Sequence, residues 1–358
     1  MNKNYYAVIM AGGVGSRFWP LSTQKLPKQF HDMLGTGNTL IQQTFNRFEN
    51  LIPSENILIA TNKKYESLVQ QQLPKITSKQ LLLEPAMRNT APCILYSAFK
   101  IYNENPDGIM VIAPSDHWIN DEPEFLKNIQ TSFDFCAKND ALMTLGIKPS
   151  SPNTGYGYIQ YNNSNNEIKK VLNFTEKPNL ETAIQFIDEG NYLWNAGIFI
   201  WSVKSILNAF ETHLPSMYAL FYKGEKSYNT ASENSFIEEN YARSENISID
   251  FGILEKASDV FVLPVEFGWN DLGTWGSLYT KLKKDKNQNA TIGGSVIYRD
   301  SNNNIVRTQS GKRVVIQGLK DYIVVEKDNV LFICPKSEEQ EIKQITTAVK
   351  TEFGDDFI

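Results

Sequence analysis

Apolar and polar positions alternate along the chain in blocks whose lengths separate strands from helices. Short apolar runs near residues 6–11, 56–60 and 108–113 predict buried strands. Longer stretches near 39–49 and 89–103 carry apolar residues at helical spacing and predict helices between those strands. Because strands that alternate with helices form βαβ units, this pattern predicts an α/β domain built on a mainly parallel central sheet.

The middle of the chain departs from this alternation. Two β-type runs, 156–161 and 168–174, flank an asparagine-rich stretch at 162–166 that is typical of a turn. We therefore expect an antiparallel hairpin and a mixed sheet. Residues 221–246 are polar and weakly periodic, which indicates helices and loops at the surface.

Beyond residue 285 the pattern changes to short β-rich runs separated by Asn, Asp and Gly turns. We expect the α/β domain to span 1–285 and a small β-rich domain to span 286–358, for which a left-handed β-helix is one candidate form. An amphipathic helix near 338–350 closes the chain. Exposed strand edges in such a domain could pair with a second copy, so we expect a homodimer.

Composition and charge limit the kinds of molecule that this protein is expected to bind. The 358 residues carry a formal net charge of −5 and no dense Lys/Arg block, so we expect neither a nucleic acid nor a membrane as partner. No stretch approaches the roughly 20 apolar residues that span a bilayer. Cys93, Cys136 and Cys334 are far apart and form no Cys-x-x-Cys pair, which argues against a disulfide framework or a structural zinc site. A cytoplasmic protein that acts on small molecules is the expectation.

The first predicted strand leads into a glycine-rich loop, Gly12-Gly13-Val14-Gly15-Ser16-Arg17. Glycines allow backbone N–H groups to approach an anion, and consecutive amides form a cradle for phosphate oxygens. Arg17, and Lys28 after Pro27, add two cations that suit a triphosphate. The loop is neither a Walker A loop, which needs Gly-Lys-Ser/Thr, nor a dinucleotide fingerprint, which needs a glycine where Phe18 stands. The plainer alternative is a strand, a flexible turn and a surface lysine.

Two aspartates follow predicted strands. Asp116 comes after the strand at 108–113, and Asp271 comes after another at 260–265. Open α/β sheets bind ligands at the carboxyl ends of their strands, and Mg²⁺ takes one or two protein carboxylates together with phosphates and water. Asp116 and Asp271 are therefore candidate ligands for Mg²⁺, and each aspartate alone is equally typical of a helix cap or turn.

Several motifs follow one another along the chain. The stretch Gly12 to Ser22 continues to Pro27-Lys28-Gln29-Phe30, and it is followed in order by Glu84–Pro92, Pro114–His117, Thr154–Ile159, Phe174–Pro178, Trp194–Gly197 and Trp269–Gly273. Together these motifs resemble the mannose-1-phosphate guanylyltransferases, and the first stretch looks like that family's phosphate-binding segment. The resemblance covers nearly the whole chain, more loosely at the β-rich end, and implies a Rossmann-like nucleotidyltransferase domain over residues 1–285.

The resemblance also implies a reaction and a set of site residues. GMP would pass from GTP to mannose 1-phosphate, giving GDP-mannose and pyrophosphate, with Arg17, Lys28, Asp116 and Asp271 in catalysis and Mg²⁺ on the two aspartates. The implied nucleotide contacts are Gly12, Gly13, Gly15, Ser16, Arg17, Lys28, Glu84, Pro85, Asn89, Thr90 and Asp116. The implied contacts to the sugar phosphate are Gly157, Glu176, Lys177, Asn195 and Gly197.

Other functions fit the same residues. The chain could use another hexose 1-phosphate or another base, or it could be a sugar-nucleotide sensor without catalysis. Many bacterial relatives continue into a phosphomannose isomerase domain, and we expect no isomerase activity from this chain.

Overall fold

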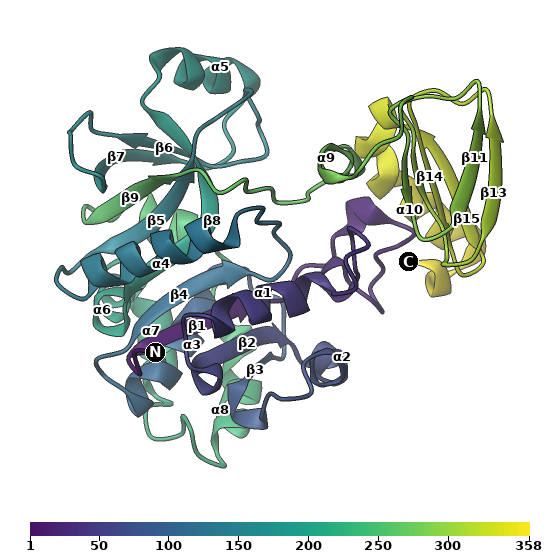
Figure 1. The fold of residues 1–358 in the computed structure, drawn as a ribbon. Coiled ribbons are helices and arrows are strands. Elements are labelled where there is room, and N and C mark those ends of the chain that lie inside the picture. Colours follow the sequence, from purple (N-terminus) through teal and green to yellow (C-terminus); the bar gives the residue numbers. More distant parts are fainter. The chain divides into compact units, whose positions relative to one another are not determined.

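The computed structural model describes all 358 residues, and the chain divides into two compact units, which we call unit 1 and unit 2 (Figure 1). Unit 1 comprises Met1–Gly12, Thr44–Ser115 and Ile119–Trp269. Unit 2 comprises Gly13–Gln43, Asp116–Trp118 and Asn270–Ile358. None of the helices combines the length and the apolar character that a membrane crossing requires.

Unit 1 is built on a nine-stranded mixed sheet in the order β3-β2-β1-β4-β8-β5-β9-β7-β6. Its strands are β1 (Tyr5–Met10), β2 (Ile57–Asn62), β3 (Leu81–Glu84), β4 (Ile109–Pro114), β5 (Leu142–Ile147), β6 (Tyr158–Tyr161), β7 (Lys169–Thr175), β8 (Tyr192–Ser202) and β9 (Val260–Val265). The pairs β1–β2, β1–β4, β2–β3 and β5–β9 are parallel, whereas β8 runs antiparallel to β4, β5 and β6. The predicted hairpin is the antiparallel pair β6–β7. The mixed, partly parallel sheet confirms the predicted fold class.

Helices cover both faces of this sheet. The helices that connect or follow these strands are α1 (Leu40–Glu49), α2 (Glu66–Gln72), α3 (Thr90–Glu104), α4 (Glu122–Cys136), α5 (Leu180–Glu189), α6 (Val203–His213), α7 (Pro215–Tyr222) and α8 (Glu233–Asn240). Successive side chains of a strand point to opposite faces. On β1, Tyr5 stacks on Phe133 of α4, with ring centroids 4.2 Å apart, whereas Tyr6 and Val8 join a core with residues of α3, α6 and α7.

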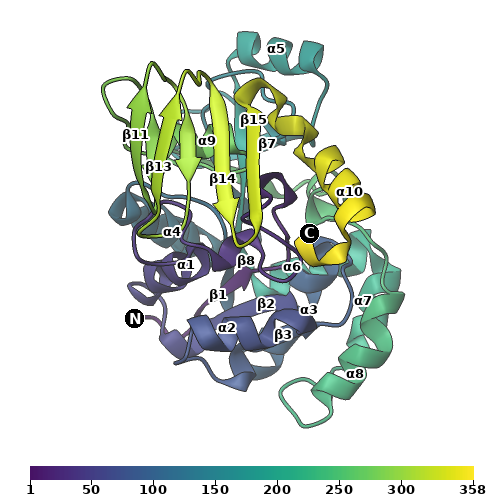
Figure 2. The same cartoon turned by 90° about the vertical axis from the view of Figure 1, so that its right-hand side faces the viewer.

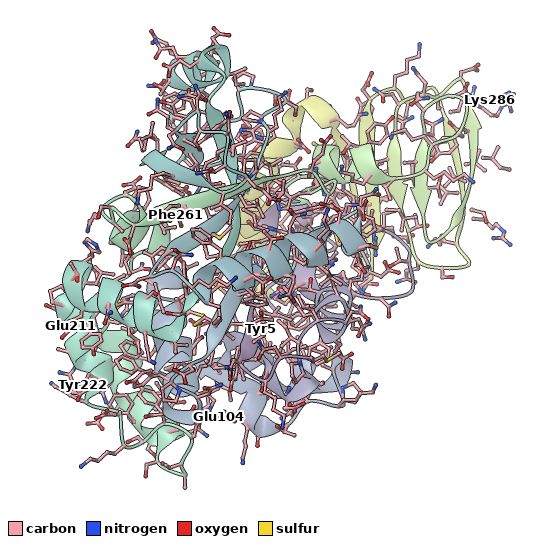
Figure 3. The ribbon with its side chains drawn as sticks, turned by 60° about the vertical axis from the view of Figure 1, so that its left-hand side comes forward. Tyr5, Glu104, Glu211, Tyr222, Phe261 and Lys286 are labelled. Atoms are coloured by element: carbon pink, nitrogen blue, oxygen red, sulfur yellow. The ribbon has the colours of Figure 1, made fainter.

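The helices α6 and α7 expose polar and aromatic side chains at the surface of unit 1. Glu211 of α6 and Tyr222 at the end of α7 lie at this surface (Figure 3), whereas Tyr5 of β1 is buried against Phe133 of α4. The segment 221–246, predicted as surface helices and loops, contains α8 and a short 3₁₀ turn. One of its polar residues is buried: Glu233 forms an ion pair with Lys100 of α3, at 2.7 Å.

Unit 2 contains the β-rich part of the chain, shown face on in Figure 2. Its elements are α9 (Trp275–Lys281), β10 (Ala290–Ile292), β11 (Ser295–Arg299), β12 (Ile305–Arg307), β13 (Arg313–Gln317), β14 (Tyr322–Lys327), β15 (Val330–Pro335) and α10 (Ile342–Phe353). The strands form one sheet in the order β10-β12-β14-β15 and a second sheet of β11 and β13. The pairs β10–β12, β12–β14 and β11–β13 are parallel, so successive coils of the chain stack on one another.

The core of unit 2 also takes in the glycine-rich segment. Phe18 packs edge to face on Trp275, with centroids 5.1 Å apart, and Trp19 packs on Phe332 of β15 at 5.3 Å. The indole of Trp19 donates to the carbonyl of Phe357 at 2.6 Å, and Lys25 pairs with Asp356 at 2.8 Å. Residues 13–43 therefore pack with the β-rich end of the chain, a grouping that the order of elements in the sequence does not reveal. The boundary between residues 285 and 286 stays a prediction.

Candidate functional site

The side chain of Lys28 is the centre of a charged cluster in unit 2. Lys28 opens a short 3₁₀ turn directly after Pro27, and only 3% of the residue is exposed. Its Nζ lies 2.9 Å from Oδ2 of Asp116 and 2.8 Å from each of the backbone carbonyls of Asp271 and Leu272. An ammonium group has three N–H donors. All three are therefore used by protein acceptors, one of them a carboxylate.

Backbone pairing brings the two aspartates to this lysine. Trp118 and Asn270 exchange both backbone hydrogen bonds, at 2.8 and 3.0 Å, and so join the segment after β4 to the segment after β9. The side chain of Asn270 then accepts from the N–H of Leu272 at 2.7 Å and closes a tight turn. This turn directs the carbonyls of residues 271 and 272 at Lys28. Asp116 and Asp271, which are 155 positions apart in the sequence, consequently lie at one pocket.

The pocket has a volume of about 260 Å³ and combines the predicted loop, cations and acids. It is lined by Gly15, Ser16, Arg17, Phe18, Lys28, Asp116, His117, Asp271, Leu272, Gly273 and Lys343. Four predicted catalytic residues, Arg17, Lys28, Asp116 and Asp271, are thus brought together within unit 2. Of the predicted nucleotide contacts, Gly15 and Ser16 line the same pocket, whereas Gly13 belongs to unit 2 without lining it.

The conformation of Gly15 makes room for Lys28. Gly15 has φ +73°, and a Cβ added there would lie 2.5 Å from Cβ of Lys28. Glycine is the residue that tolerates both the left-handed backbone and the close approach. A Cβ on Gly13, by contrast, would meet no atom within 4 Å. The loop is therefore tight against the lysine at Gly15 and open at Gly13.

Arg17 has an unsatisfied donor. Its Nε is buried and has no hydrogen-bond partner. Buried polar groups of native proteins are nearly always paired, and each exception requires an explanation. A bound phosphate would supply the missing acceptor, because guanidinium groups pair well with phosphate oxygens.

The donor set at the pocket suits a hard divalent cation that also binds substrate. No group of three or more His, Cys, Asp or Glu side chains is arranged to enclose a metal ion. Two carboxylates, those of Asp116 and Asp271, nevertheless line the pocket. Mg²⁺ usually takes one or two protein carboxylates and fills its other positions with phosphate and water oxygens. The residues present therefore fit Mg²⁺ bound together with a nucleotide.

The electrostatics keep Asp116 ionised. Burial acts to raise the pKa of the Asp116 carboxyl, but the nearby charges of Lys28 and His117 outweigh it, so that its pKa lies below the ordinary value. Asp116 is therefore a carboxylate at neutral pH, the form that binds a metal ion.

The predicted sugar-phosphate contacts form a second cluster, in unit 1. A Cβ added to Gly157 would lie 2.5 Å from Oε2 of Glu176 and 3.4 Å from Cβ of Asn195, so these three residues are immediate neighbours. Lys177 pairs with Glu176 and has φ +49°, an uncommon backbone angle for a lysine. Tyr156 packs edge to face on Trp194, with centroids 5.0 Å apart, and adds an aromatic side to the cluster.

Several groups fix the orientation of the Asn195 amide. Its Oδ1 accepts from Thr144 Oγ1 at 3.1 Å and from the N–H of Gly197 at 3.0 Å, and its Nδ2 donates to Asp250 at 3.0 Å. Burial, with the nearby charge of Glu176, raises the pKa of Asp250 to about 6. The sequence analysis missed Asp250, because a pairing across 55 positions leaves no local pattern.

The predicted base contacts lie elsewhere in unit 1, between β3 and α3. Glu84 ends β3, is 9% exposed and accepts a hydrogen bond from the hydroxyl of Tyr241. Burial raises the pKa of Glu84 to about 7. Asn89 caps α3 through Thr90, and the Thr90 hydroxyl accepts from the N–H of Ile249 at 2.9 Å. Gly12, also in unit 1, is close to Glu84, since an added Cβ would lie 3.9 Å from Oε2.

The segment that follows β3 is also tied to the rest of unit 1. Pro85 occupies the bend between β3 and α3. Arg88 donates to the carbonyl of Ala242 at 3.0 Å, and Ala91 donates to the carbonyl of Ile247 at 3.2 Å. The segment 242–250 therefore contacts both predicted clusters of unit 1.

The class of protein to which this fold and pocket belong follows from the match of the sequence to a known family. The sequence matches the family described as "Nucleotidyl transferase" over residues 6–288 and the "MannoseP isomerase/GMP-like beta-helix domain" over residues 294–348. The β-rich end is therefore of the β-helix-like type that the sequence left as one candidate form.

Similar proteins show which family of nucleotidyl transferases the chain belongs to. The chain is 34% identical to a mannose-1-phosphate guanylyltransferase of Salmonella montevideo, over 96% of this chain and 74% of the relative. It is 33% identical to the alginate biosynthesis protein AlgA of Pseudomonas fluorescens, over 96% of this chain and 71% of that protein. A crystal structure from Thermus thermophilus, described as "mannose-1-phosphate geranyltransferase", superposes with a TM-score of 0.88 at 29% identity, covering 97% of this chain and 99% of that one. The protein belongs to the mannose-1-phosphate guanylyltransferase family, as the motifs predicted.

Proposed function

We propose that this protein transfers GMP from GTP to mannose 1-phosphate, releasing GDP-mannose and pyrophosphate, and that the reaction requires Mg²⁺. The observation that carries the proposal is the hydrogen-bonding of Lys28 to both aspartate segments, beside the unpaired Nε of Arg17. The named relatives support the choice of GTP and mannose 1-phosphate.

For the bonds to change, the protein has mainly to align the two substrates and to neutralise the charge on their phosphates. An oxygen of the sugar phosphate forms a bond to the α-phosphorus of GTP, and the bond from that phosphorus to the bridging oxygen of the β-phosphate breaks. The sugar phosphate carries about −1.5 to −2 charge near neutral pH, so no general base is required to activate it. Bound at Asp116 and Asp271, Mg²⁺ would neutralise charge on the phosphates.

The residues of the chain then have separable tasks. Lys28 holds Asp116 in place as an ionised ligand. Arg17 donates to phosphate oxygens in a partly buried site, where such bonds are strong. Positioning the two reactants in line supplies the remainder of the rate, because it removes the entropy cost of bringing them together.

We assign the two clusters of unit 1 to the recognition of the base and the sugar. The segment from Glu84 to Thr90 offers hydrogen-bonding groups for guanine. Glu176 can accept from sugar hydroxyls, and Lys177 can meet the phosphate of the sugar. The fixed amide of Asn195 presents one orientation to a hydroxyl group. These residue roles are part of the proposal.

Two further assignments belong to it. We propose a homodimer formed through the β-rich part of unit 2, where Ile297 and Val315 lie opposite each other on β11 and β13 and are 63% and 68% exposed. We also propose a cytoplasmic location, in keeping with three free cysteines, Cys93, Cys136 and Cys334, that are all buried.

The test is the release of pyrophosphate over a grid of nucleoside triphosphates and sugar 1-phosphates, with and without Mg²⁺. We expect the largest kcat/KM for GTP with mannose 1-phosphate and no turnover after chelation. A maximum at another sugar or base would replace the substrate assignment and leave the reaction class intact. Binding of GTP without turnover of any pair would favour the sensor instead.

A further inference from the structure

The C-terminal helix contributes a cation to the phosphate pocket. Lys343 is the second residue of α10 and lines the pocket together with Arg17, Asp116 and Asp271. The preceding residue, Ile342, is fully buried in the core of unit 2 that also contains Phe18. The helix is thus anchored next to the Ser16–Phe18 turn, which it packs against, and the position of Lys343 at the pocket follows from that packing.

Lys343 is available to a ligand, whereas Lys28 is not. The three donors of Lys28 are engaged by Asp116, Asp271 and Leu272, so Lys28 would have to give up a partner to donate to a phosphate. The ammonium group of Lys343 has neither an ion pair nor a hydrogen bond and does not pair with either aspartate of the pocket. Lys350, on the same helix, shows the contrast, because it pairs with Asp355 at 2.9 Å.

The charge of a nucleoside triphosphate calls for such a group. The β- and γ-phosphates carry most of its negative charge, and the two carboxylates of the pocket repel them. An Mg²⁺ ion held by Asp116 and Asp271 would offset part of this charge, and further cations would hold the phosphates. Lys28 balances one of the two aspartates by direct pairing. Arg17 and Lys343 are then the cations left to face the phosphates.

We propose that Lys343 binds the β- and γ-phosphates of the nucleoside triphosphate and the pyrophosphate that leaves. This inference rests on the proposed function and assigns to α10 a part in nucleotide binding, in addition to its place in the core of unit 2. Lys28 is then a positioning residue for the aspartate pair, and Lys343 takes the phosphate-binding task that the sequence pattern assigned to Lys28.

The experiment compares Lys343→Ala, Lys343→Arg and the control Lys350→Ala, which removes a lysine from the same helix away from the pocket. The dissociation constant of pyrophosphate is measured by calorimetry in the presence of Mg²⁺, and KM is measured for GTP and for mannose 1-phosphate. A charge-assisted hydrogen bond at a partly open site predicts about a tenfold weaker affinity for pyrophosphate and a similar rise in the KM for GTP in Lys343→Ala. The KM for mannose 1-phosphate should change less than twofold, and Lys343→Arg should recover most of the loss.

Two outcomes separate this inference from the proposed function. If the wild type forms GDP-mannose and Lys343→Ala binds pyrophosphate as tightly as Lys350→Ala does, Lys343 is not a phosphate ligand. If the wild type binds pyrophosphate with Mg²⁺, the Lys343→Ala variant loses that affinity, and no GDP-mannose forms, the inference holds and the proposed reaction is wrong. Because the side chain of Lys343 is exposed, the variants should fold, which circular dichroism checks directly.

Discussion

The ammonium nitrogen of Lys28 lies 2.9 Å from a carboxylate oxygen of Asp116, and it makes this contact from a side chain that is almost fully buried. Removing the charge with Lys28→Met leaves Asp116 and two backbone carbonyls without their donor. We expect kcat/KM to fall by about a hundredfold, in the range seen when one strong electrostatic contact is lost from an active site. Steady-state kinetics with GTP as the varied substrate measure this fall.

The matched variant is Lys28→Arg, which keeps the charge. Three acceptors surround a tetrahedral ammonium group here, and a planar guanidinium group is larger and cannot reproduce that arrangement. We expect Lys28→Arg to recover less than a tenth of the lost activity. Full activity in the arginine variant would show that only the charge at this position matters.

The two aspartates should differ in their effect on stability. In Asp271→Asn the backbone carbonyl that accepts from Lys28 remains, so turnover should fall by at least a hundredfold while the melting temperature changes by less than about 2 °C. Asp116→Asn removes the partner of a buried lysine and should lower the free energy of unfolding by about 1–3 kcal/mol as well. Activity assays and thermal unfolding of both variants separate the two effects. Equal losses of stability would contradict the distinct roles.

Gly157 should control the binding of the sugar phosphate and not of the nucleotide. An alanine Cβ would lie 2.5 Å from Oε2 of Glu176 and force that carboxylate to move. We expect Gly157→Ala to raise the KM for mannose 1-phosphate about tenfold, equivalent to about 1.4 kcal/mol, with little change in the KM for GTP. The control is Gly155→Ala, whose Cβ would meet the Asn153 side chain at 3.1 Å and not Glu176. Similar effects of both alanines would point to the loop backbone instead of Glu176.

His31 should make stability depend on acidity. Burial lowers the pKa of His31 to about 4, from an ordinary value of 6.5. Between these values the unfolded chain binds the proton and the folded protein does not, so this contribution is fully present above pH 6.5 and is lost as the pH falls toward 4. The loss amounts to about 3 kcal/mol in the free energy of unfolding.

The measurement compares urea unfolding of the wild type and of His31→Gln between pH 4 and pH 7. Glu84 and Asp250 have raised pKa values, about 7 and about 6, and therefore act in the opposite direction, losing stability as the pH rises. The difference between variant and wild type cancels both and isolates His31. Glutamine can still donate to the carbonyl of Leu26, the present partner of the imidazole at 3.0 Å. A difference that does not vary with pH would rule out a titrating His31.

The sequence predicted the charged cluster better than the arrangement around it. Arg17 follows the glycine-rich loop, Asp116 and Asp271 follow strands, and Lys28 follows a proline, so a local pattern marks each of them. The acceptors of Lys28 include the backbone carbonyls of residues 271 and 272, which exist at every position and carry no sequence signal. Lys343 is one of 35 Lys and Arg residues on an ordinary amphipathic helix, and only tertiary packing distinguishes it.

The sequence also did not predict that residues 13–43 pack with the β-rich end of the chain. The order of strands and helices predicted the sheet of unit 1, because βαβ connections are local in sequence. The packing of Phe18 on Trp275 and of Trp19 on Phe332 joins aromatic residues more than 250 positions apart, and aromatic residues have many alternative partners in a chain of this composition. Asp250 was missed in the same way, since its partner Asn195 lies on β8.

The hydrogen bond from the indole of Trp19 to the carbonyl of Phe357 has a practical meaning for anyone who handles this protein. The final residues contact the segment that follows the glycine-rich loop, so we expect an affinity tag or a fluorescent fusion joined to Ile358 to disturb that segment. Labels belong at the amino terminus, where Met1 is 75% exposed.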